Sequence, residues 1–368
     1  MTETNHSPRI GGFDLIKVLA LYIIMVYHLT FRNELYVLEG YLPDILEYTV
    51  YCFMSVCVPL LFMVSGALSL PAPMNLRKSV RRSLQVLLIT TFWLFFSLLW
   101  VLFLRREAVS LSRFMSILSW LEVGYVQHLW FMPNFFFLGL MTPVLQTLRD
   151  ANRKIYRFFL LIILICTFGN ALLSDVEYLL RWIFDLGYYY GDREYFWFNN
   201  FFDYNYWYIF IYYTLAGFLM EHRDFLRKYR KYALCAIPVC VVALLICGLA
   251  RSHVTGEVFD PIYYNYDAPF TLLLTAAMFI LMIDLKPGRI LARFSASISR
   301  CSMGIYLVHW LLIELLLTYF PAVTDANRYA PFTGAGILLL SWGITLICEK
   351  IPIVKNLFTV SPKWVKKG

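Results

Sequence analysis

The chain has 368 residues, of which 60% are hydrophobic and only 15% are charged. This composition excludes an ordinary soluble globular protein and predicts an all-α, polytopic membrane protein. The formal net charge of +8 does not by itself indicate nucleic-acid binding, because membrane proteins gather lysine and arginine on their cytoplasmic side.

Apolar segments that are long enough to cross a bilayer recur along the sequence, and we expect about ten transmembrane helices. Their approximate limits are 12–30, 47–70, 84–104, 128–148, 156–174, 205–221, 232–250, 268–284, 300–320 and 331–349. With the N-terminus in the cytoplasm, most lysines and arginines of the connecting segments also fall on the cytoplasmic side. This distribution predicts that the N- and C-termini are both cytoplasmic. The first segment is too long for the apolar region of a signal peptide, so we expect it to be retained.

The first apolar segment, residues 13–30, carries Asp14, Lys17 and His28. An ionisable group in hydrocarbon costs at least about 2.5 kcal/mol, so a spanning helix that keeps three of them indicates a function. Lys17 and His28 are separated by about 20° around a helix and about 16 Å along it. Asp14 lies on the same side. We therefore expect this stripe to face protein or water.

Two further histidines lie in apolar segments. His128 opens the fourth segment, and His309 lies about 14 Å into the ninth, near Ser302, Tyr306 and Glu314. Each imidazole could belong to a polar contact that locks helices together or to a reaction site, and the sequence leaves both interpretations open.

The eight cysteines fall in or beside apolar runs, which is typical of small buried residues. No CxxC motif or Cys/His spacing indicates a metal site, and we expect no metal.

Segment 174–204 is long and rich in tyrosine, tryptophan and phenylalanine. It could be an interfacial aromatic belt, or an aromatic platform for sugars with hydroxyl partners among nearby polar side chains. These are Asp185, Asp192, Asn199, Asn200 and Asp203.

Four short segments match the motifs of one family in order. The run from Asp14 through Lys17 to His28 resembles the opening D-x-x-R-x10-H helix of the acyltransferase-3 family of integral membrane acyltransferases. The other three segments are similar to its F-x-x-S-G, H-x-W-F and S-x-x-x-Y-L-x-H motifs. They are Phe62-Met-Val-Ser65-Gly66, His128-Leu-Trp130-Phe131 and Ser302-Met-Gly-Ile-Tyr306-Leu-Val-His309.

The resemblance implies transfer of an acyl group, most often acetyl, from a cytoplasmic acyl-CoA such as acetyl-CoA to a hydroxyl of an envelope polysaccharide or lipid-linked sugar. It implies one transmembrane acyltransferase domain over residues 1–368, with soluble tails at 1–11 and 350–368 and no fused soluble module. The expected location of this domain is the inner (plasma) membrane. Expected partners are membrane lipids and the glycan acceptor, and no nucleic acid.

In this interpretation His28 is the catalytic general base, because a neutral imidazole titrates near pH 7, and an acyl-histidine intermediate is the variant mechanism. Lys17 would hold a phosphate or the thioester region of the donor, and Asp14 would orient Lys17. The secondary polar groups that bind substrate or donor would be Ser65, His128, Trp130, Tyr306 and His309.

The basic cluster Arg77, Lys78, Arg81 and Arg82 could receive the nucleotide phosphates or could bind anionic lipid. One position departs from the family pattern, because Lys17 stands where the family has arginine. A lysine ammonium group cannot form the bidentate contact that an arginine guanidinium makes with phosphate or carboxylate. Buried polar residues would also fit a transporter or flippase for an envelope glycan or small solute. The internal repeat typical of transporters is not apparent.

Overall fold

The computed structural model describes residues 9–30, 42–106, 110–112, 127–187, 206–262, 266–321 and 327–360, and the regular structure in these ranges is helical. The α-helices are α1 (Gly11–Thr30), α2 (Leu42–Met54), α3 (Cys57–Ser69), α4 (Leu76–Arg105), α6 (Phe131–Ala151), α7 (Arg153–Leu164), α8 (Asn170–Ile183), α10 (Tyr208–Glu221), α11 (Arg223–Arg227), α12 (Arg230–Thr255), α13 (Pro269–Met282), α14 (Arg289–Arg300), α15 (Ser302–Tyr319) and α17 (Ala330–Cys348). Shorter turns are η1 (Gln127–Trp130), the π-helix η2 (Ile165–Gly169), η3 (Asn327–Tyr329) and η4 (Val354–Leu357).

The multi-pass, all-α architecture is confirmed. In the described part of the chain, 8 helical stretches are long and apolar enough to cross a membrane, and α10 and α13 are shorter apolar helices. Each of the ten segments expected from the sequence coincides with one of these. The number of crossings and the side of each terminus stay predictions. Most of the aromatic segment 174–204, from residue 188 to 204, lies outside the described residues, so its role as an interfacial belt or a sugar platform stays a prediction.

Two helix boundaries differ from the expectation. α4 begins at Leu76, because the side chain of Asn75 caps it by accepting a hydrogen bond from the backbone N–H of Lys78 at 2.9 Å. The basic residues that follow therefore lie in the first turns of a helix. The second expected span is interrupted between α2 and α3, because Pro59 has no N–H to donate to the carbonyl of Ser55.

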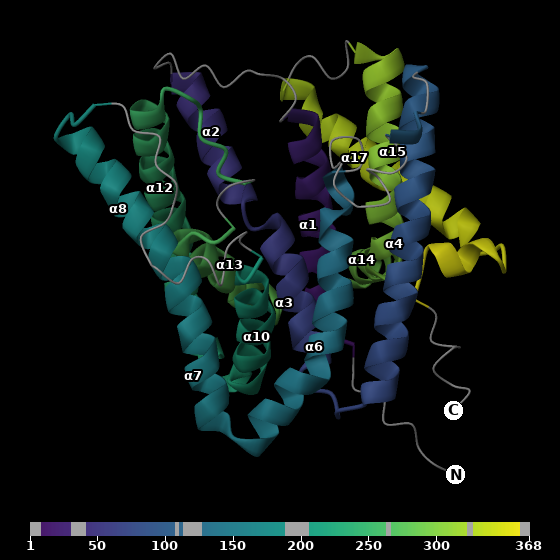
Figure 1. Ribbon diagram of the computed structural model, residues 1–368, viewed down its shortest axis with the longest axis horizontal. Helices are drawn as coiled ribbons and strands as arrows, with labels where there is room; N and C mark the ends of the chain where they lie inside the picture. Colours follow the sequence, from purple (N-terminus) through teal and green to yellow (C-terminus); the bar gives the residue numbers. More distant parts are fainter. Residues whose placement is uncertain are drawn as a thin grey trace.

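Helix α1 lies within the bundle and not at its edge. It packs against α3, α13, α14, α15 and α17, and Figure 1 shows it between α3 and the group formed by α14, α15 and α17. Ile16, Ala20 and Met25 have no exposed surface. Neighbouring helices therefore shield the polar residues of this span from hydrocarbon.

Helices α8 and α12 form one edge of the molecule (Figure 1). They are joined by a buried ion pair in which Arg251 Nη2 lies 2.6 Å from Asp175 Oδ1, with 3% and 2% of the side chains exposed. The Arg251 guanidinium also lies over the rings of Tyr178 and Phe259. A buried pair of this kind is costly to break, because either charge alone would be left in a low-dielectric environment.

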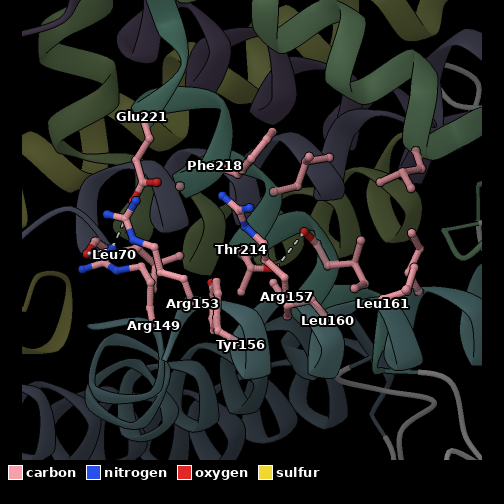
Figure 2. A pocket seen from close by; sticks show the side chains of 15 residues that line it. Leu70, Arg149, Arg153, Tyr156, Arg157, Leu160, Leu161, Thr214, Phe218 and Glu221 are labelled. Carbon is pink, nitrogen blue, oxygen red and sulfur yellow. Dashed lines mark hydrogen bonds and ion pairs between the residues drawn. The ribbon is translucent and has the colours of Figure 1, made fainter. Parts of the chain in front are cut away.

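The end of α3 is fastened to the end of α6. Arg149 Nη1 donates to the carbonyl of Leu70 at 2.9 Å, and both residues are labelled in Figure 2. Gln146 Nε2 donates to the carbonyls of Ser69 at 3.0 Å and Ala72 at 2.7 Å. These bonds satisfy carbonyls that the helix end leaves without intrahelical partners.

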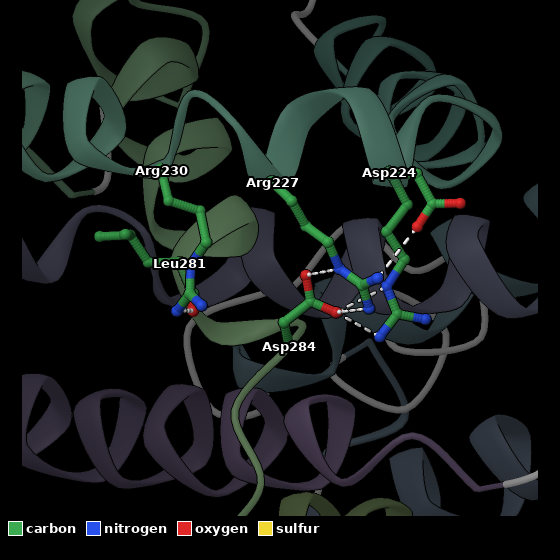
Figure 3. A network of polar contacts seen from close by, with 6 residues as sticks. Asp224, Arg227, Arg230, Leu281 and Asp284 are labelled. Atoms are coloured by element: carbon green, nitrogen blue, oxygen red, sulfur yellow. Dashed lines mark hydrogen bonds and ion pairs between the residues drawn. The ribbon is translucent and has the colours of Figure 1, made fainter.

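An arginine network holds α11 against the end of α13 (Figure 3). Arg223 Nε donates to Asp284 Oδ1 at 2.8 Å, and Arg227 Nε donates to Asp284 Oδ2 at 2.9 Å. Arg230 Nη2 donates to the carbonyl of Leu281 at 2.7 Å. The hydrogen bonds from Arg227 and Arg223 lower the pKa of Asp284 from 3.8 to about 2. The network is thus built around an ionised carboxylate.

Replacing Asp284 by Asn should lower the stability of the purified protein by on the order of 1–3 kcal/mol and with it the thermal midpoint, because two guanidinium groups lose the negative charge and one of the two acceptor oxygens of their common partner. The depressed pKa means that the wild-type contribution is complete above about pH 4 and is lost as the pH falls toward 2. Asp224→Asn is the control, since Asp224 is 92% exposed and contacts the same Arg227. Equal midpoints for both variants would contradict the assignment.

Candidate active site

A cavity of about 250 Å³ lies between α1, α3, α4, α6 and α15. Lys17 of α1, Ser65 of α3, Arg82 of α4 and Tyr306 of α15 all line it. Four residues that the sequence indicated separately therefore meet around one space, although they are far apart in the chain. Lys17 is half-buried and Arg82 is exposed, so the cationic side of the cavity reaches toward the surface at the start of α4.

The opposite wall of the cavity is aromatic and apolar. Phe131, Met132 and Phe135 of α6 line it. The ring of Phe62 lies behind them, with its centroid 4.8 Å from that of Phe131 and 5.4 Å from that of Phe135. Packing of these rings joins the F-x-x-S-G segment of α3 to the H-x-W-F segment that begins α6.

Ser65 and Gly66 are adjacent residues of α3 that face different surroundings. Ser65 Oγ donates to the carbonyl of Leu61 at 2.9 Å and lines the cavity. Gly66 packs on α10, and a Cβ atom at this position would overlap the backbone of Tyr213. Glycine is needed here because the backbones of α3 and α10 approach closely.

Three histidines gather beside the cavity. The ring of His309 lies between those of His28 and His128, with centroid distances of 5.5 and 5.6 Å. Trp310 packs against the same group, 5.1 Å from His28 and 5.0 Å from His128. His128 and His309 are 1% and 0% exposed, whereas His28 is half-buried.

Tyr306 separates the cavity from the three histidines. Its ring lies 5.4 Å from that of His309 and 6.1 Å from that of His128. Its hydroxyl donates to the carbonyl of His128, and its own carbonyl is bonded to Nδ1 of His309. Tyr306 thus forms the cavity wall on one side and, on the other, is hydrogen-bonded to the backbone of His128 and to the imidazole of His309.

Three imidazole nitrogens in this cluster are buried without a hydrogen-bond partner in the described part of the chain. They are Nδ1 and Nε2 of His128 and Nε2 of His309. Buried polar atoms are nearly always satisfied, and exceptions concentrate where a structure binds or reacts. Among the described residues, no group of three or more His, Cys, Asp or Glu side chains is placed to hold a metal ion.

Comparison with known families decides the class of protein. A family model described as an acyltransferase domain matches residues 10–346, which is most of the chain. The protein belongs to the acyltransferase-3 family. It is therefore a multi-pass membrane acyltransferase. No curated protein and no solved structure matches the chain.

Asp14 has a partner that was not expected from the sequence. Its carboxylate accepts hydrogen bonds from Arg9 Nε at 2.7 Å and Arg9 Nη2 at 2.9 Å. That Asp14 also orients Lys17 stays a prediction. Arg9 Nη2 also donates to the carbonyl of Ala296 in α14. The bonds to Asp14 raise the pKa of Arg9. Asp14 thus joins the beginning of α1 to α14.

The basic cluster at the start of α4 is only partly at the cavity. Arg82 lines it, whereas Arg77 and Arg81 do not. Helix geometry explains the difference, because residues on successive positions of a helix point in directions about 100° apart.

Trp130 does not line the cavity either. It points to other aromatic rings, with centroids 5.8 Å from Tyr206 and 6.2 Å from Tyr266. The adjacent Phe131 takes the position on the cavity wall. His128 belongs to the histidine cluster and is not part of the cavity lining.

Two residues of this region were not expected from the sequence. Trp310 packs on the histidines, and its position next to His309 was a signal that could have identified it. Asp260 Oδ2 accepts a hydrogen bond from the hydroxyl of Tyr27 at 2.7 Å, beside His28 in α1. Nothing local marks Asp260, because it lies more than 200 residues away in a connecting segment.

Gly66→Ala should destabilise the protein by about 1–3 kcal/mol, because the added methyl group would force α3 away from α10. The thermal midpoint of the purified protein and the yield of folded monomer measure this effect. Gly336→Ala in α17 is the matched control, since a Cβ atom there meets nothing within 4 Å. A wild-type midpoint for Gly66→Ala would show that the helices do not approach as described.

Proposed function

We propose that this acyltransferase transfers an acyl group, most simply acetyl, from cytoplasmic acyl-CoA to a hydroxyl of an envelope polysaccharide or lipid-linked sugar at the inner (plasma) membrane. The observation that carries the proposal is the cavity lined by Lys17 and Tyr306. It is cationic at one side, and at the other it reaches the ring of Tyr306, which packs against His309.

The cavity suits the donor because coenzyme A combines anionic phosphates with a narrow, mostly uncharged arm that ends in the thioester. Lys17 and Arg82 supply positive charge for a phosphate. The volume of about 250 Å³ is smaller than most whole-ligand sites, and it fits an arm better than an entire nucleotide. The nucleotide would then lie outside, near Arg77 and Arg81, which also retain the alternative role of binding anionic lipid.

His28 is the imidazole best placed to act as general base. It is half-buried, while His128 and His309 are enclosed, so a substrate hydroxyl has access to His28 first. His28 would take the hydroxyl proton while the oxygen attacks the thioester carbonyl. The carbon–sulfur bond then breaks, and the coenzyme A thiolate takes the proton from the imidazolium. In the variant mechanism, His28 itself carries the acyl group before the hydroxyl attacks.

His128 and His309 act in this scheme as positioning residues. His309 contacts the ring of His28, and His128 contacts the ring of Trp310, which packs on His28. Tyr306 is hydrogen-bonded to the main-chain carbonyl of His128 and, through its own carbonyl, to Nδ1 of His309. Membership of an acyltransferase family favours this chemistry over the transporter or flippase alternative, which would function without coenzyme A.

Lys17→Gln should weaken binding of acetyl-CoA by about 10- to 100-fold, because it removes a charged hydrogen-bond donor from the cavity. The measurement is the rise in thermal midpoint of the purified protein with increasing acetyl-CoA, since a ligand that binds the folded state stabilises it. Lys17→Arg keeps the charge and should retain the rise. A full response from Lys17→Gln would remove Lys17 from the donor site, and no response from wild type would argue against a coenzyme A donor.

His28→Ala should lower the rate of acyl transfer at least about 100-fold while leaving the acetyl-CoA-induced rise in thermal midpoint intact. Transfer is followed by release of free coenzyme A in membranes that contain the native acceptor. His253→Ala is the control, because His253 is an exposed histidine at the end of α12. Transfer at the wild-type rate by His28→Ala would overturn the mechanism.

A further inference from the structure

A second cavity, of about 300 Å³, opens between α6, α7 and α10 and shares no residue with the active-site cavity. Figure 2 shows Arg149 and Arg153 with Glu221 at one end of it, and Leu160 and Leu161 toward the other. We refer to this cavity as the α7 groove.

Arginines form the polar end of the α7 groove. Arg149 is already engaged, because it donates to the carbonyl of Leu70 and to Asp150 and lies 3.6 Å from Glu221. Arg153 and Arg157 are exposed, and within the described residues neither has a hydrogen bond or ion pair. They lie one helical turn apart on α7, so their guanidinium groups can contact the same anion.

The rest of the α7 groove is apolar. Its lining includes Leu164 of α7, Ile211 and Leu215 of α10, and Leu272 of α13. Leu161 and Phe218 also line it, yet they are 49% and 47% exposed. From Arg153 to Leu164, α7 rises about 16 Å, which is close to half of the roughly 30 Å hydrocarbon core of a bilayer. The groove therefore extends through about one leaflet.

We propose that the α7 groove binds an anionic phospholipid, with its phosphate at Arg153 and Arg157 and one acyl chain lying along α7 between Leu161 and Leu215. The positive charge of Arg153 and Arg157 favours an anionic head group. The length of the apolar part of the groove matches an acyl chain that spans one leaflet. A nucleotide or free phosphate would leave the leucine-lined part without a partner. A soluble protein segment would have to enter the hydrocarbon layer to reach it.

This lipid has a structural consequence. The lipid phosphate would lie next to the turn between α6 and α7, and the acyl chain would fill the space between α7 and α10. α10 also packs on α3 at Gly66, and α3 carries Ser65 of the active-site cavity. Occupancy of the groove should therefore stabilise the folded protein, whether or not the proposed acyl-CoA chemistry is correct.

The test measures the thermal midpoint of the delipidated full chain in detergent, with added palmitoyl-oleoyl phosphatidylglycerol or with phosphatidylcholine that has the same chains. Phosphatidylglycerol should raise the midpoint more than phosphatidylcholine. Arg153→Gln/Arg157→Gln should weaken the apparent affinity for phosphatidylglycerol about tenfold or more. Native mass spectrometry of the same samples counts the bound lipid.

Two controls separate a built site from general effects of charge. Arg289→Gln/Arg293→Gln removes two exposed arginines at the same spacing on α14, away from the groove, and should keep the full response. Leu215→Trp fills the groove without changing charge and should reduce the response. Inorganic phosphate at the same concentration should produce no rise.

Three results would overturn the proposal. One is an equal response of wild type and Arg153→Gln/Arg157→Gln to phosphatidylglycerol. Another is an equal loss in both double variants, which would indicate diffuse attraction of an anionic lipid to a basic surface. The third is a full response to inorganic phosphate, which would make the apolar groove irrelevant.

Discussion

The structure depends on keeping the ionisable groups of α1 out of hydrocarbon. Asp14, Lys17 and His28 lie on one spanning helix, and each would be costly if it faced lipid. The fold places α1 inside the bundle and gives each group a different environment. Asp14 is bonded to Arg9, Lys17 lines a cavity, and His28 packs against His309 and Trp310. The same enclosure that stabilises α1 therefore also builds the candidate site.

The helices around α1 are held in register by close packing. Gly66 lets α3 approach α10 at the backbone, and Phe62 locks α3 to the first turns of α6. These contacts bring Ser65 and Phe131 to one cavity wall. Family motifs that look unrelated along the sequence are thus parts of one packing arrangement, in which some residues hold helices together and their neighbours face the site.

Tyr306 divides the site into two regions with different chemistry. On one side lies a cavity with cationic residues and an apolar wall, which fits our proposal for the donor. On the other lie three histidines, two of them with buried nitrogens that lack partners among the described residues. Transfer would take place where the two regions meet, so neither substrate would have to cross the whole membrane. The α7 groove is separate from both regions and is lined by different residues.

The sequence alone determined the fold class, the family and the approximate positions of the long apolar helices in the described residues, because long apolar segments and local motifs are properties of neighbouring residues. It also identified the stripe on α1, since helical periodicity relates Lys17 to His28 without knowledge of other helices. Only the tertiary structure decided that Arg9 is a partner of Asp14, that Arg82 rather than Arg77 or Arg81 reaches the cavity, and that Phe131 replaces Trp130 on its wall. The physical reason is that helical periodicity defines a face but not what that face meets. The rotation of each helix and its neighbours come from packing between segments that are hundreds of residues apart.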